Sequence, residues 1–395
     1  MIYLDNGATT FPKPEVVYQA MDIFARTGAV NAGRGAYAAA RAADQMIKNV
    51  RTGLISLMDA REQAQVVLTP SVTIALNQII YGQVWTEKSI AYVSPYEHNS
   101  VLRPLDVLSK KIGFQVLELP LAEDLSIDLA KTAAMFEENP PSFVAVTAVS
   151  NVTGYILPHR EIFRLARRYG AFNLLDGSQA VGLIRLPFAQ TMADAICFAG
   201  HKTLYGPFGI AGFLIKNSAK LQVTLAGGTG TKSEDLAMPT SLPGSMEAGS
   251  KDTVAIAGLE AALKWLPSVK PLEHECAMVA HFIEEAGKID GVELYCAPGG
   301  LQNQAGVVSF GVRGFKAIEV AAILDNKYDI AVRAGHHCAA LIHQHLGSNK
   351  YAGTVRVSPG YFNTMEDIEV LLIALRNLDR SQLEGVADDI LRGAC

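Results

Sequence analysis

The stretch Phe198-Ala-Gly-His-Lys202-Thr-Leu-Tyr-Gly-Pro-Phe-Gly209 joins a short apolar strand to a glycine-rich loop. The expected strand is Ala195–Phe198, and a second strand, Ile210–Ile215, follows the loop. Lys202 therefore stands just beyond the end of a strand. An amine at that place can form a Schiff base with an aldehyde cofactor when burial lowers its pKa. A surface lysine in a glycine loop is the alternative, and the neighbouring segments are needed to decide.

Short strands alternate with longer helical patterns through most of the chain. Segments such as Ile74–Gln83 and Glu161–Tyr169 have the periodicity of helices that lie on a sheet. The alternation predicts an α/β protein with a large, doubly wound, mostly parallel sheet and helices on both faces. Ligands bind such sheets beyond the carboxyl ends of the strands. The other expected strands of this sheet are Gln65–Leu68, Ser89–Ser94, Phe143–Val149 and Phe172–Leu175.

A second, smaller α/β domain is expected in the C-terminal part of the chain. Gly227–Gly249, rich in Gly, Ser, Thr and Pro, separates the large sheet from a helix that begins near Thr253. Beyond it, Val307–Val312 and Ile330–Val332 have the composition of strands, and Met365–Leu378 that of a closing helix. The expected parts are an N-terminal segment that associates with the small domain (1–15), a large cofactor-binding domain (16–252) and the small domain (253–395).

Length, charge and cysteine content exclude several classes of protein. The chain has 395 residues, 49% hydrophobic and 18% charged, which suits two or three domains with sizeable cores. Its 34 basic and 39 acidic residues give a net charge of −5. The chain thus has no excess of basic residues to neutralise the phosphates of a nucleic acid. No apolar run suits a membrane span and no signal peptide is recognised, which predicts a soluble, cytoplasmic protein. The 5 cysteines are scattered and predict no disulfide framework.

Polar residues follow two of the expected strands directly. Asp176 comes after Phe172–Leu175, and Asn151 comes after Phe143–Val149. A carboxylate at a strand end can pair with a protonated pyridine nitrogen and keep that ring an electron sink. An asparagine there can hydrogen-bond a phenolic oxygen. Both are also ordinary turn residues, so neither decides the function alone.

Two further segments offer groups for an anion and for a flat ring. Thr69-Pro-Ser-Val-Thr-Ile-Ala-Leu-Asn77 begins a helix after the strand Gln65–Leu68. Hydroxyls and free N–H groups at a helix start suit a phosphate, although an ordinary helix cap has the same composition. His98 lies four residues beyond Ser94. Its imidazole can stack on a ring or move protons, or it can be a plain loop residue.

Together these residues resemble the cofactor site of the class V aminotransferase superfamily of pyridoxal phosphate enzymes, and within it the cysteine desulfurases. The resemblance extends from Tyr3-Leu-Asp-Asn-Gly-Ala-Thr-Thr10 to Tyr361-Phe-Asn-Thr-Met-Glu-Asp367. It implies the fold-type I architecture of pyridoxal-phosphate-dependent transferases. The matching residues, in chain order, are Thr73, His98, Asn151, Asp176, Gln179, His201 and Lys202.

The resemblance assigns these residues roles around pyridoxal 5'-phosphate. Lys202 would hold the cofactor as a Schiff base and later move protons on the substrate carbon. His98 would stack on the ring, and Asp176 would pair with the ring nitrogen. Asn151 and Gln179 would lie near the phenolic oxygen. The groups expected to bind the phosphate are Val72 through its backbone, Thr73, His201 and, across a homodimer interface, Ser250.

Val332-Arg-Ala-Gly-His-His-Cys338-Ala-Ala resembles the short catalytic-cysteine loop of desulfurases, which selenocysteine lyases also carry. By that resemblance Cys338 accepts a sulfur atom as a persulfide. The adjacent histidines and a helix start would favour its thiolate form. A buried structural thiol is one alternative. Zinc is another, because four histidines lie within a few residues of the thiol: His336, His337, His343 and His345.

Thr354-Val-Arg356-Val-Ser matches the family's arginine that grips the substrate carboxylate. A planar guanidinium suits that role because it binds a carboxylate through two parallel hydrogen bonds. A segment that begins with Asn31-Ala-Gly-Arg34 would line the substrate entrance. The expected substrate-binding residues are thus Arg356, Asn31 and Arg34.

The sequence departs from the family pattern at five positions. Ala199 stands where a hydroxyl contact to the phosphate is usual, and Tyr37 stands in place of a histidine near the entrance. Ile74 replaces a glutamate, Ser71 a glycine and Ser245 an arginine. None of these changes removes a group that the carbon–sulfur chemistry needs, but they can weaken cofactor affinity or change the substrate.

The expected function is that of a homodimeric cysteine desulfurase that converts L-cysteine to L-alanine. It would leave a persulfide on Cys338 for iron–sulfur cluster assembly or another sulfur pathway, through a sulfur-acceptor protein. Lys202, Cys338 and His98 are the expected catalytic residues, with no metal. The rival expectations are a selenocysteine lyase acting on L-selenocysteine, another lyase or aminotransferase of the superfamily, and a non-enzymatic scaffold that binds the cofactor or zinc.

Overall fold

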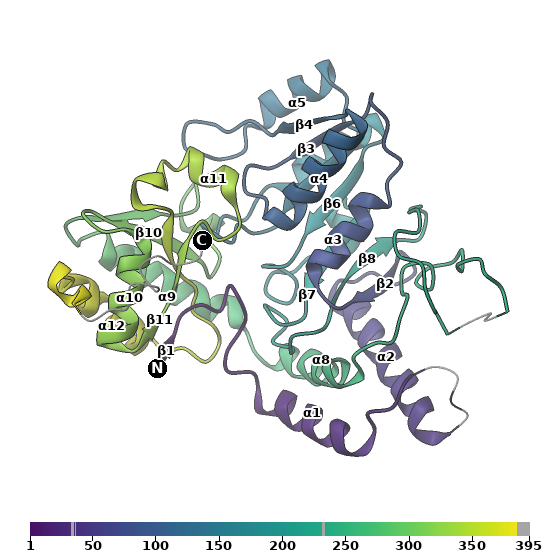
Figure 1. Cartoon of the computed structure of the whole chain (residues 1–395). Coiled ribbons are helices and arrows are strands. Elements are labelled where there is room, and N and C mark those ends of the chain that lie inside the picture. The colour runs from purple at the N-terminus through teal and green to yellow at the C-terminus, as the bar shows by residue number, and fades with distance from the viewer. Residues whose placement is uncertain (33–34, 36, 231–233, 385–395) are drawn as a thin grey trace.

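A seven-stranded sheet forms the larger part of the molecule (Figure 1). Across the sheet the strands are β2 (Ala64–Thr69), β8 (Ala211–Lys216), β7 (Ala195–Ala199), β6 (Phe172–Asp176), β5 (Phe143–Thr147), β3 (Ile90–Val93) and β4 (Gln115–Glu118). Within this sheet, β8 runs opposite to both of its neighbours and the remaining strands share one direction. The predicted α/β fold with a mostly parallel sheet is confirmed in this computed structural model, which describes residues 1–32, 35, 37–230 and 234–384.

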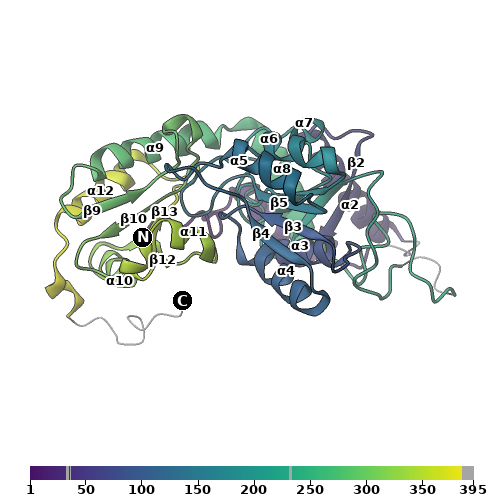
Figure 2. The same ribbon diagram turned by 90° about the horizontal axis from the view of Figure 1, so that it is seen from above.

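Helices cover both faces of this sheet. They are α2 (Ala38–Leu57), α3 (Val72–Tyr81), α4 (Asn99–Ile112), α5 (Leu129–Glu138), α6 (His159–Ala166), α7 (Phe188–Thr191) and α8 (Thr253–Trp265). Alternate strand residues point to opposite sides, so Val67 packs in one cluster with α3 and α4, while Val66 and Leu68 pack with α6 and α8. Figure 2 shows α3 and α4 along one side of the strands and α5, α6 and α8 along the other. Among the described residues, no helix is long and apolar enough to cross a membrane.

A second, four-stranded antiparallel sheet has its own core. Its strands, in order, are β12 (Arg333–Gly335), β13 (Thr354–Val357), β10 (Val308–Val312) and β9 (Val292–Tyr295). Three helices pack on it: α9 (Pro271–Ala286), α10 (Ala317–Tyr328) and α12 (Met365–Arg376). The short helix α11 (Ala340–His345) follows β12. Phe282 of α9 and Phe310 of β10 are fully buried at the centre of this core.

The N-terminal segment connects the small domain to the large domain. Its strand β1 (Ile2–Tyr3) pairs in parallel with β11 (Ile330–Ala331), and Asp5 bridges to Ser358. Figure 1 shows the N-terminus among the elements of the small domain. The chain then crosses to α1 (Glu15–Thr27), which packs on α8. Residues 5–13 therefore span both halves of the molecule.

The structure differs from the expected elements in two respects. Strands β1, β4, β9, β12 and β13 were not predicted. Of these, β4 and β9 lie at sheet edges and their residues are mostly half-exposed or exposed, which leaves little apolar signal. Helix α8 was assigned with the C-terminal domain, but its residues Ile256 and Leu259 belong to the core of the large sheet. We therefore propose a domain boundary after α8 and not at residue 253.

Candidate active site

A cavity of about 210 Å³ opens at the carboxyl edge of the large sheet. Thr147 and Asp176 line it from the last positions of β5 and β6, and β7 leads into the loop that carries Lys202. The strand order turns here, because β3 has β4 on one side and β5 on the other, and such a switch point is where open α/β sheets bind ligands. The small sheet closes the cavity with Arg333 and Arg356.

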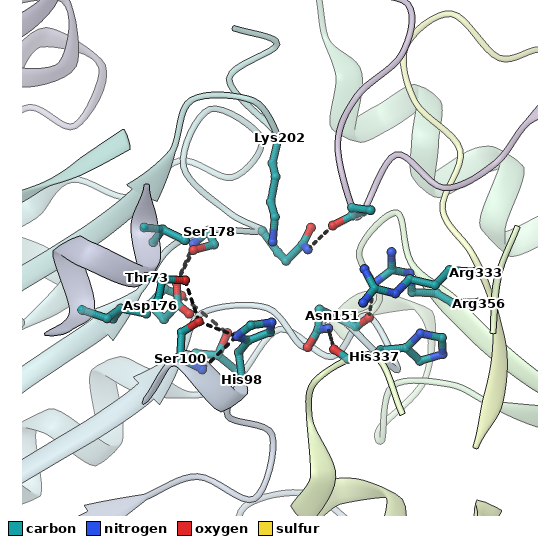
Figure 3. A pocket seen from close by; sticks show the side chains of 16 residues that line it. Thr73, His98, Ser100, Asn151, Asp176, Ser178, Lys202, Arg333, His337 and Arg356 are labelled. Atoms are coloured by element: carbon teal, nitrogen blue, oxygen red, sulfur yellow. Dashed lines mark hydrogen bonds between the residues drawn. The ribbon is translucent and has the colours of Figure 1, made fainter. Parts of the chain in front are cut away.

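Lys202 reaches into the centre of this cavity from the loop after β7 (Figure 3). The loop turns back at once, since the N–H of Tyr205 donates to the Lys202 carbonyl oxygen over 2.8 Å. Burial lowers the pKa of Lys202 to about 8, and the nearby arginines act in the same direction while Asp176 opposes them. About a tenth of the amine is therefore neutral at pH 7, far more than for an ordinary lysine. The neutral amine is the form that attacks a carbonyl carbon.

Asp176 lines the cavity opposite the arginines and is held by its own turn. Its Oδ1 accepts hydrogen bonds from the N–H of Ser178, at 3.0 Å, and from the Ser178 hydroxyl, at 2.5 Å. The side chain is almost completely buried. These two donors fix the direction of the carboxylate, so Asp176 presents a fixed acceptor to whatever occupies the cavity.

A second acid, Glu97, lies buried behind the cavity wall. Its Oε1 accepts from the Ser94 hydroxyl at 2.6 Å and from the N–H of Thr147 at 2.5 Å. Burial raises the pKa of Glu97 to about 8, and the nearby Asp176 also raises it. Glu97 is therefore a neutral acid at pH 7 that ties the end of β3 to the end of β5.

His98 and two hydroxyls form one wall of the cavity (Figure 3). The Nδ1 of His98 accepts from the N–H of Ser100 at 3.0 Å and so caps α4. Burial, with the charge of Lys202, lowers the pKa of His98 to about 4. The ring is thus neutral, and because Nδ1 is an acceptor the proton sits on Nε2. Beside it, the hydroxyls of Thr73 and Ser100 lie 2.9 Å apart.

The start of α3 offers an anion site next to these hydroxyls. Val72 and Thr73 line the cavity in the first turn of this helix, and Ser71 caps it by accepting from the N–H of Ile74 at 3.3 Å. The free N–H groups and the positive end of the helix dipole therefore face the cavity. Ala199 brings no hydroxyl, but Ser100 supplies one beside Thr73.

Arg356 is buried in β13 and already carries partners within the chain. One NH2 group donates to Oδ1 of Asp5 at 2.5 Å, and NH1 donates to the Asn151 carbonyl oxygen at 3.2 Å. Its Nε is buried without a hydrogen-bond partner among the described residues. Gly7 lies against the guanidinium, where an added Cβ would come within 3.2 Å of Cζ. The guanidinium therefore has a fixed direction where the small sheet meets the cavity.

The amides of Asn151 and Gln179 both line the cavity and hold neighbouring segments in place. The Asn151 amide donates to the His337 carbonyl oxygen at 2.7 Å, and the Gln179 amide donates to the Gly7 carbonyl oxygen at 2.7 Å. These bonds tie the cysteine loop and the N-terminal segment to the large sheet. The expected contact of both residues with a phenolic oxygen remains a prediction.

Cys338 lies at the edge of the site, half-buried, in a loop with left-handed backbone at both His337 (φ 49°) and Cys338 (φ 57°). Arg333, which lines the cavity, donates from NH2 to the sulfur at 3.7 Å. The N–H of Asn99 donates to the Cys338 carbonyl oxygen at 2.6 Å and so ties the loop to α4. The thiol thus stands one side chain away from the cavity.

The histidine that precedes the thiol brings no positive charge to it. His337 is buried, its Nε2 lies 2.9 Å from the Thr354 hydroxyl, and burial lowers its pKa well below the ordinary range. It is therefore neutral and turned toward β13. The cation that contacts the sulfur is Arg333, not a histidine.

Three expected site residues lie elsewhere, and a fourth falls outside the described residues. Asn31 and Ser250 line a separate hollow of about 720 Å³. The ring of His201 stacks on Phe208 with 4.5 Å between centroids, and burial lowers its pKa to about 3. His201 is not among the residues that line the main cavity. Arg34 lies outside the described residues.

Sequence reasoning missed four residues that shape the site. Ser178 and Ser100 each lie two positions after a predicted site residue, and that spacing is typical of a side chain that accepts from its own turn. Arg333 lies inside the quoted cysteine loop but was not singled out. Asp5 carries no local signal, because its partner is 351 positions away along the chain.

The donor set fits pyridoxal 5'-phosphate. One cavity holds an amine of lowered pKa, a fixed carboxylate for a pyridinium nitrogen, a neutral imidazole and a helix start for a phosphate. The buried Nε of Arg356 has no acceptor among the described residues. Among the described residues, no group of three His, Cys, Asp or Glu side chains is placed to hold a metal ion.

Comparison with known proteins defines the class first. The family model of class V aminotransferases matches residues 2–371, so the chain belongs to that family. The architecture of the chain, a mostly parallel sheet with a cavity at its switch point, agrees with that class.

Within this family the chain resembles cysteine desulfurases, as its sequence predicted. It is 31% identical to a probable cysteine desulfurase of Methanothermobacter thermautotrophicus, over 94% of this chain and 92% of that relative. A cysteine desulfurase of Shigella flexneri is 29% identical over 96% and 94% of the two chains. The solved cysteine desulfurase of Thermococcus onnurineus superposes with a TM-score of 0.87 at 28% identity, covering 95% and 94%. One from Escherichia coli gives 0.82 at 26% identity, covering 98% and 95%.

Proposed function

We propose that this protein is a pyridoxal-phosphate-dependent cysteine desulfurase that converts L-cysteine to L-alanine and keeps the sulfur on Cys338. The observation that carries the proposal is the convergence of Lys202, Asp176 and Arg356 on one cavity, with Cys338 one side chain away. An aminotransferase has no need of a thiol at that place. The names of the relatives support the same activity.

The bound cofactor would supply an electron sink for the carbon–sulfur bond cleavage. Lys202 would bind it covalently and then carry the proton of the substrate's α carbon, for which a pKa near 8 suits neutral pH. Asp176, fixed by Ser178, would keep a proton on the ring nitrogen. His98, neutral and with Nε2–H facing the cavity, would lie flat on the ring.

Arg356 would bind the substrate carboxylate with its unused N–H groups. Its partners Asp5 and Asn151 already fix the direction of the guanidinium, so little side-chain entropy is lost on binding. The start of α3, with Thr73 and Ser100, would take the phosphate at the opposite end of the cavity.

Cys338 would attack the substrate sulfur. The new S–S bond forms as the carbon–sulfur bond of the substrate breaks. The electron pair of the broken bond goes to the substrate carbon, which takes up a proton, and the product is alanine. L-cysteine and a thiol thus give L-alanine and a persulfide, and no outside oxidant is needed. Arg333 would attract the negative sulfur in this step, because it donates to Sγ in the structure.

We further propose that two copies of this chain form the working enzyme. Asn31 and Ser250 are expected to contact substrate and phosphate, yet they line a hollow apart from the chain's own cavity. Apolar side chains are exposed near that region, among them Ile74 and Leu225. An adjoining copy would cover these side chains and receive Ser250.

The test measures alanine and sulfide released from L-cysteine in the presence of a thiol reductant. We expect equal amounts of both products from the wild type and loss of both from Cys338→Ala. Cys296→Ala is the matched control, because Cys296 is a half-buried thiol remote from the cavity lining, and it should keep wild-type rates. No alanine from a wild type that binds the cofactor would overturn the proposal. Activity of Cys338→Ala on L-selenocysteine would instead favour a selenocysteine lyase.

A further inference from the structure

The carbonyl oxygen of His201 is the most heavily hydrogen-bonded acceptor near the site. It belongs to the peptide unit that leads into Lys202. Four donors reach it: Lys13 Nζ at 2.8 Å, the Thr9 hydroxyl at 2.9 Å, the Thr10 N–H at 3.1 Å and the Thr10 hydroxyl at 3.3 Å. A carbonyl oxygen has two lone pairs, so these donors share them. All four come from residues 9–13, the segment that crosses between the two halves of the molecule.

Lys13 is the charged member of this group. Besides the His201 carbonyl oxygen, its ammonium donates to the Thr10 hydroxyl at 2.7 Å and to the Thr9 hydroxyl at 3.3 Å. No carboxylate of a described residue forms an ion pair with it. Burial lowers the pKa of Lys13 to about 7, which shows that removing this ammonium from water is costly. Its three hydrogen bonds go to Thr9, Thr10 and the His201 carbonyl oxygen, so Lys13 ties the N-terminal segment to the peptide before Lys202.

The peptide that Lys13 binds decides where Lys202 points. On its other side, the Lys202 carbonyl oxygen accepts from the Tyr205 N–H at 2.8 Å. The Thr10 hydroxyl lies 3.3 Å from this oxygen and 3.3 Å from that of His201, so it shares its one proton between them. The side chain leaves this clamped turn directly into the cavity (Figure 3). A rotation of the His201–Lys202 peptide would therefore swing Nζ across the cavity.

We infer that Lys13 is a positioning residue, which holds the His201–Lys202 peptide through the His201 carbonyl oxygen and thereby fixes the direction of the Lys202 amine. This inference rests on the proposed function, in which Lys202 binds the cofactor. Lys13 is not among the residues that line the cavity. It acts through the peptide, and a misplacement of about 1 Å at the reacting amine can cost about 100-fold in rate.

The experiment compares the holoenzyme of the wild type with Lys13→Met, which keeps the length of the side chain and removes its donors. We expect kcat to fall by about 10- to 100-fold, with KM for L-cysteine within about twofold because Arg356 is untouched. The visible circular dichroism of the Lys202-bound cofactor should weaken at unchanged cofactor content, since that signal reports how rigidly the ring is held. Lys13→Arg, which retains N–H donors and charge, should recover part of both.

Two controls separate the possible failures. Lys110→Met removes an exposed lysine that pairs with Asp106, and it should leave rate and dichroism unchanged. If Lys13→Met does not fold, Thr9→Val removes one donor to the same carbonyl and should lower kcat and dichroism to a smaller extent. An unchanged kcat and dichroism in a variant that only melts earlier would overturn the inference. A wild type without any visible cofactor signal would overturn the proposed function instead.

Discussion

Burial sets the protonation states of the cavity residues, and it does so residue by residue. The pKa of His98 falls to about 4 and that of Lys202 to about 8, because both lose hydration of their charged forms. The same effect raises the pKa of Glu97 to about 8. Neutral imidazole, partly neutral amine and neutral acid therefore coexist at pH 7. Arg333 and Arg356 add two guanidinium charges on one side of the cavity, opposite the carboxylate of Asp176 (Figure 3).

Replacement of Arg333 tests the charge beside the thiol. In Arg333→Met the only described donor to the Cys338 sulfur is lost. A hydrogen bond to a charged group contributes roughly 1.5 kcal/mol, which corresponds to about tenfold in rate, so we expect alkylation of Cys338 by iodoacetamide to slow by about that factor. Mass spectrometry of the Cys338 peptide measures it.

Arg313→Met is the matched control for this prediction, since Arg313 is an exposed arginine paired with Asp290. It should leave the alkylation rate unchanged. Equal alkylation rates in Arg333→Met and the wild type would show that Arg333 has no influence on the thiol.

The sequence predicts site residues well where the signal is local. Lys202, Asp176, His98 and Thr73 follow strand ends within a few positions, and the structure brings all four to one cavity. Arg333 and Asp5 were missed because their importance depends on contacts made in the folded state. The direction of His337 toward Thr354 was missed for the same reason, since it is set by packing and not by the place of this residue beside Cys338.

Single elements connect the site to the rest of the molecule, and α9 shows how. Its residue Glu275 is buried, and Oε1 accepts from the Tyr205 hydroxyl at 3.0 Å. That hydroxyl in turn accepts from the Tyr361 N–H at 2.7 Å. Tyr205 ends the turn that begins at Lys202, with a left-handed backbone (φ 57°). Helix α9 of the small core thus braces the lysine loop of the large one.

This contact predicts a pH dependence of stability. Burial raises the pKa of Glu275 to about 8 from 4.5, so between these values the folded protein holds a proton that the unfolded chain has released. The contribution of the neutral acid is complete below pH 4.5 and is lost as pH rises toward 8. Wild type should therefore lose stability relative to Glu275→Gln across this range, by at most about 1.4 kcal/mol per pH unit.

Urea denaturation of both proteins at pH 5 and pH 7.5 measures this difference. Glu97→Gln is a useful companion, because its buried acid has a similarly raised pKa but does not contact α9. It should show a separate effect that adds to the first. A stability difference between wild type and Glu275→Gln that is the same at both pH values would contradict the assignment.

At the scale of the whole molecule, the sequence predicts the class of fold but not the pairing of strands that lie far apart along the chain. Alternating strands and helices predict the large sheet, because the apolar runs are long and buried on both faces. The reversed direction of β8 and the pairing of β1 with β11 carry no such pattern. They depend on contacts between segments far apart along the chain. The Asp5–Arg356 pair is another such contact.

The Asp5–Arg356 pair predicts that small carboxylates can stabilise a variant that lacks Asp5. The Arg356 side chain is 1% exposed and that of Asp5 21%, so Asp5→Ala leaves a buried cation without its counter-charge. Breaking such a pair costs about 3 kcal/mol. We expect a lower melting temperature and, because the space beside the guanidinium is then free, its recovery by acetate at high concentration. Chloride at equal ionic strength should not restore it, since it cannot form two parallel hydrogen bonds. The double variant Asp5→Ala, Arg356→Met should no longer respond to acetate. If chloride and acetate stabilise Asp5→Ala equally, Asp5 does not act as a carboxylate bound to Arg356, and the carboxylate site proposed for the substrate loses its support.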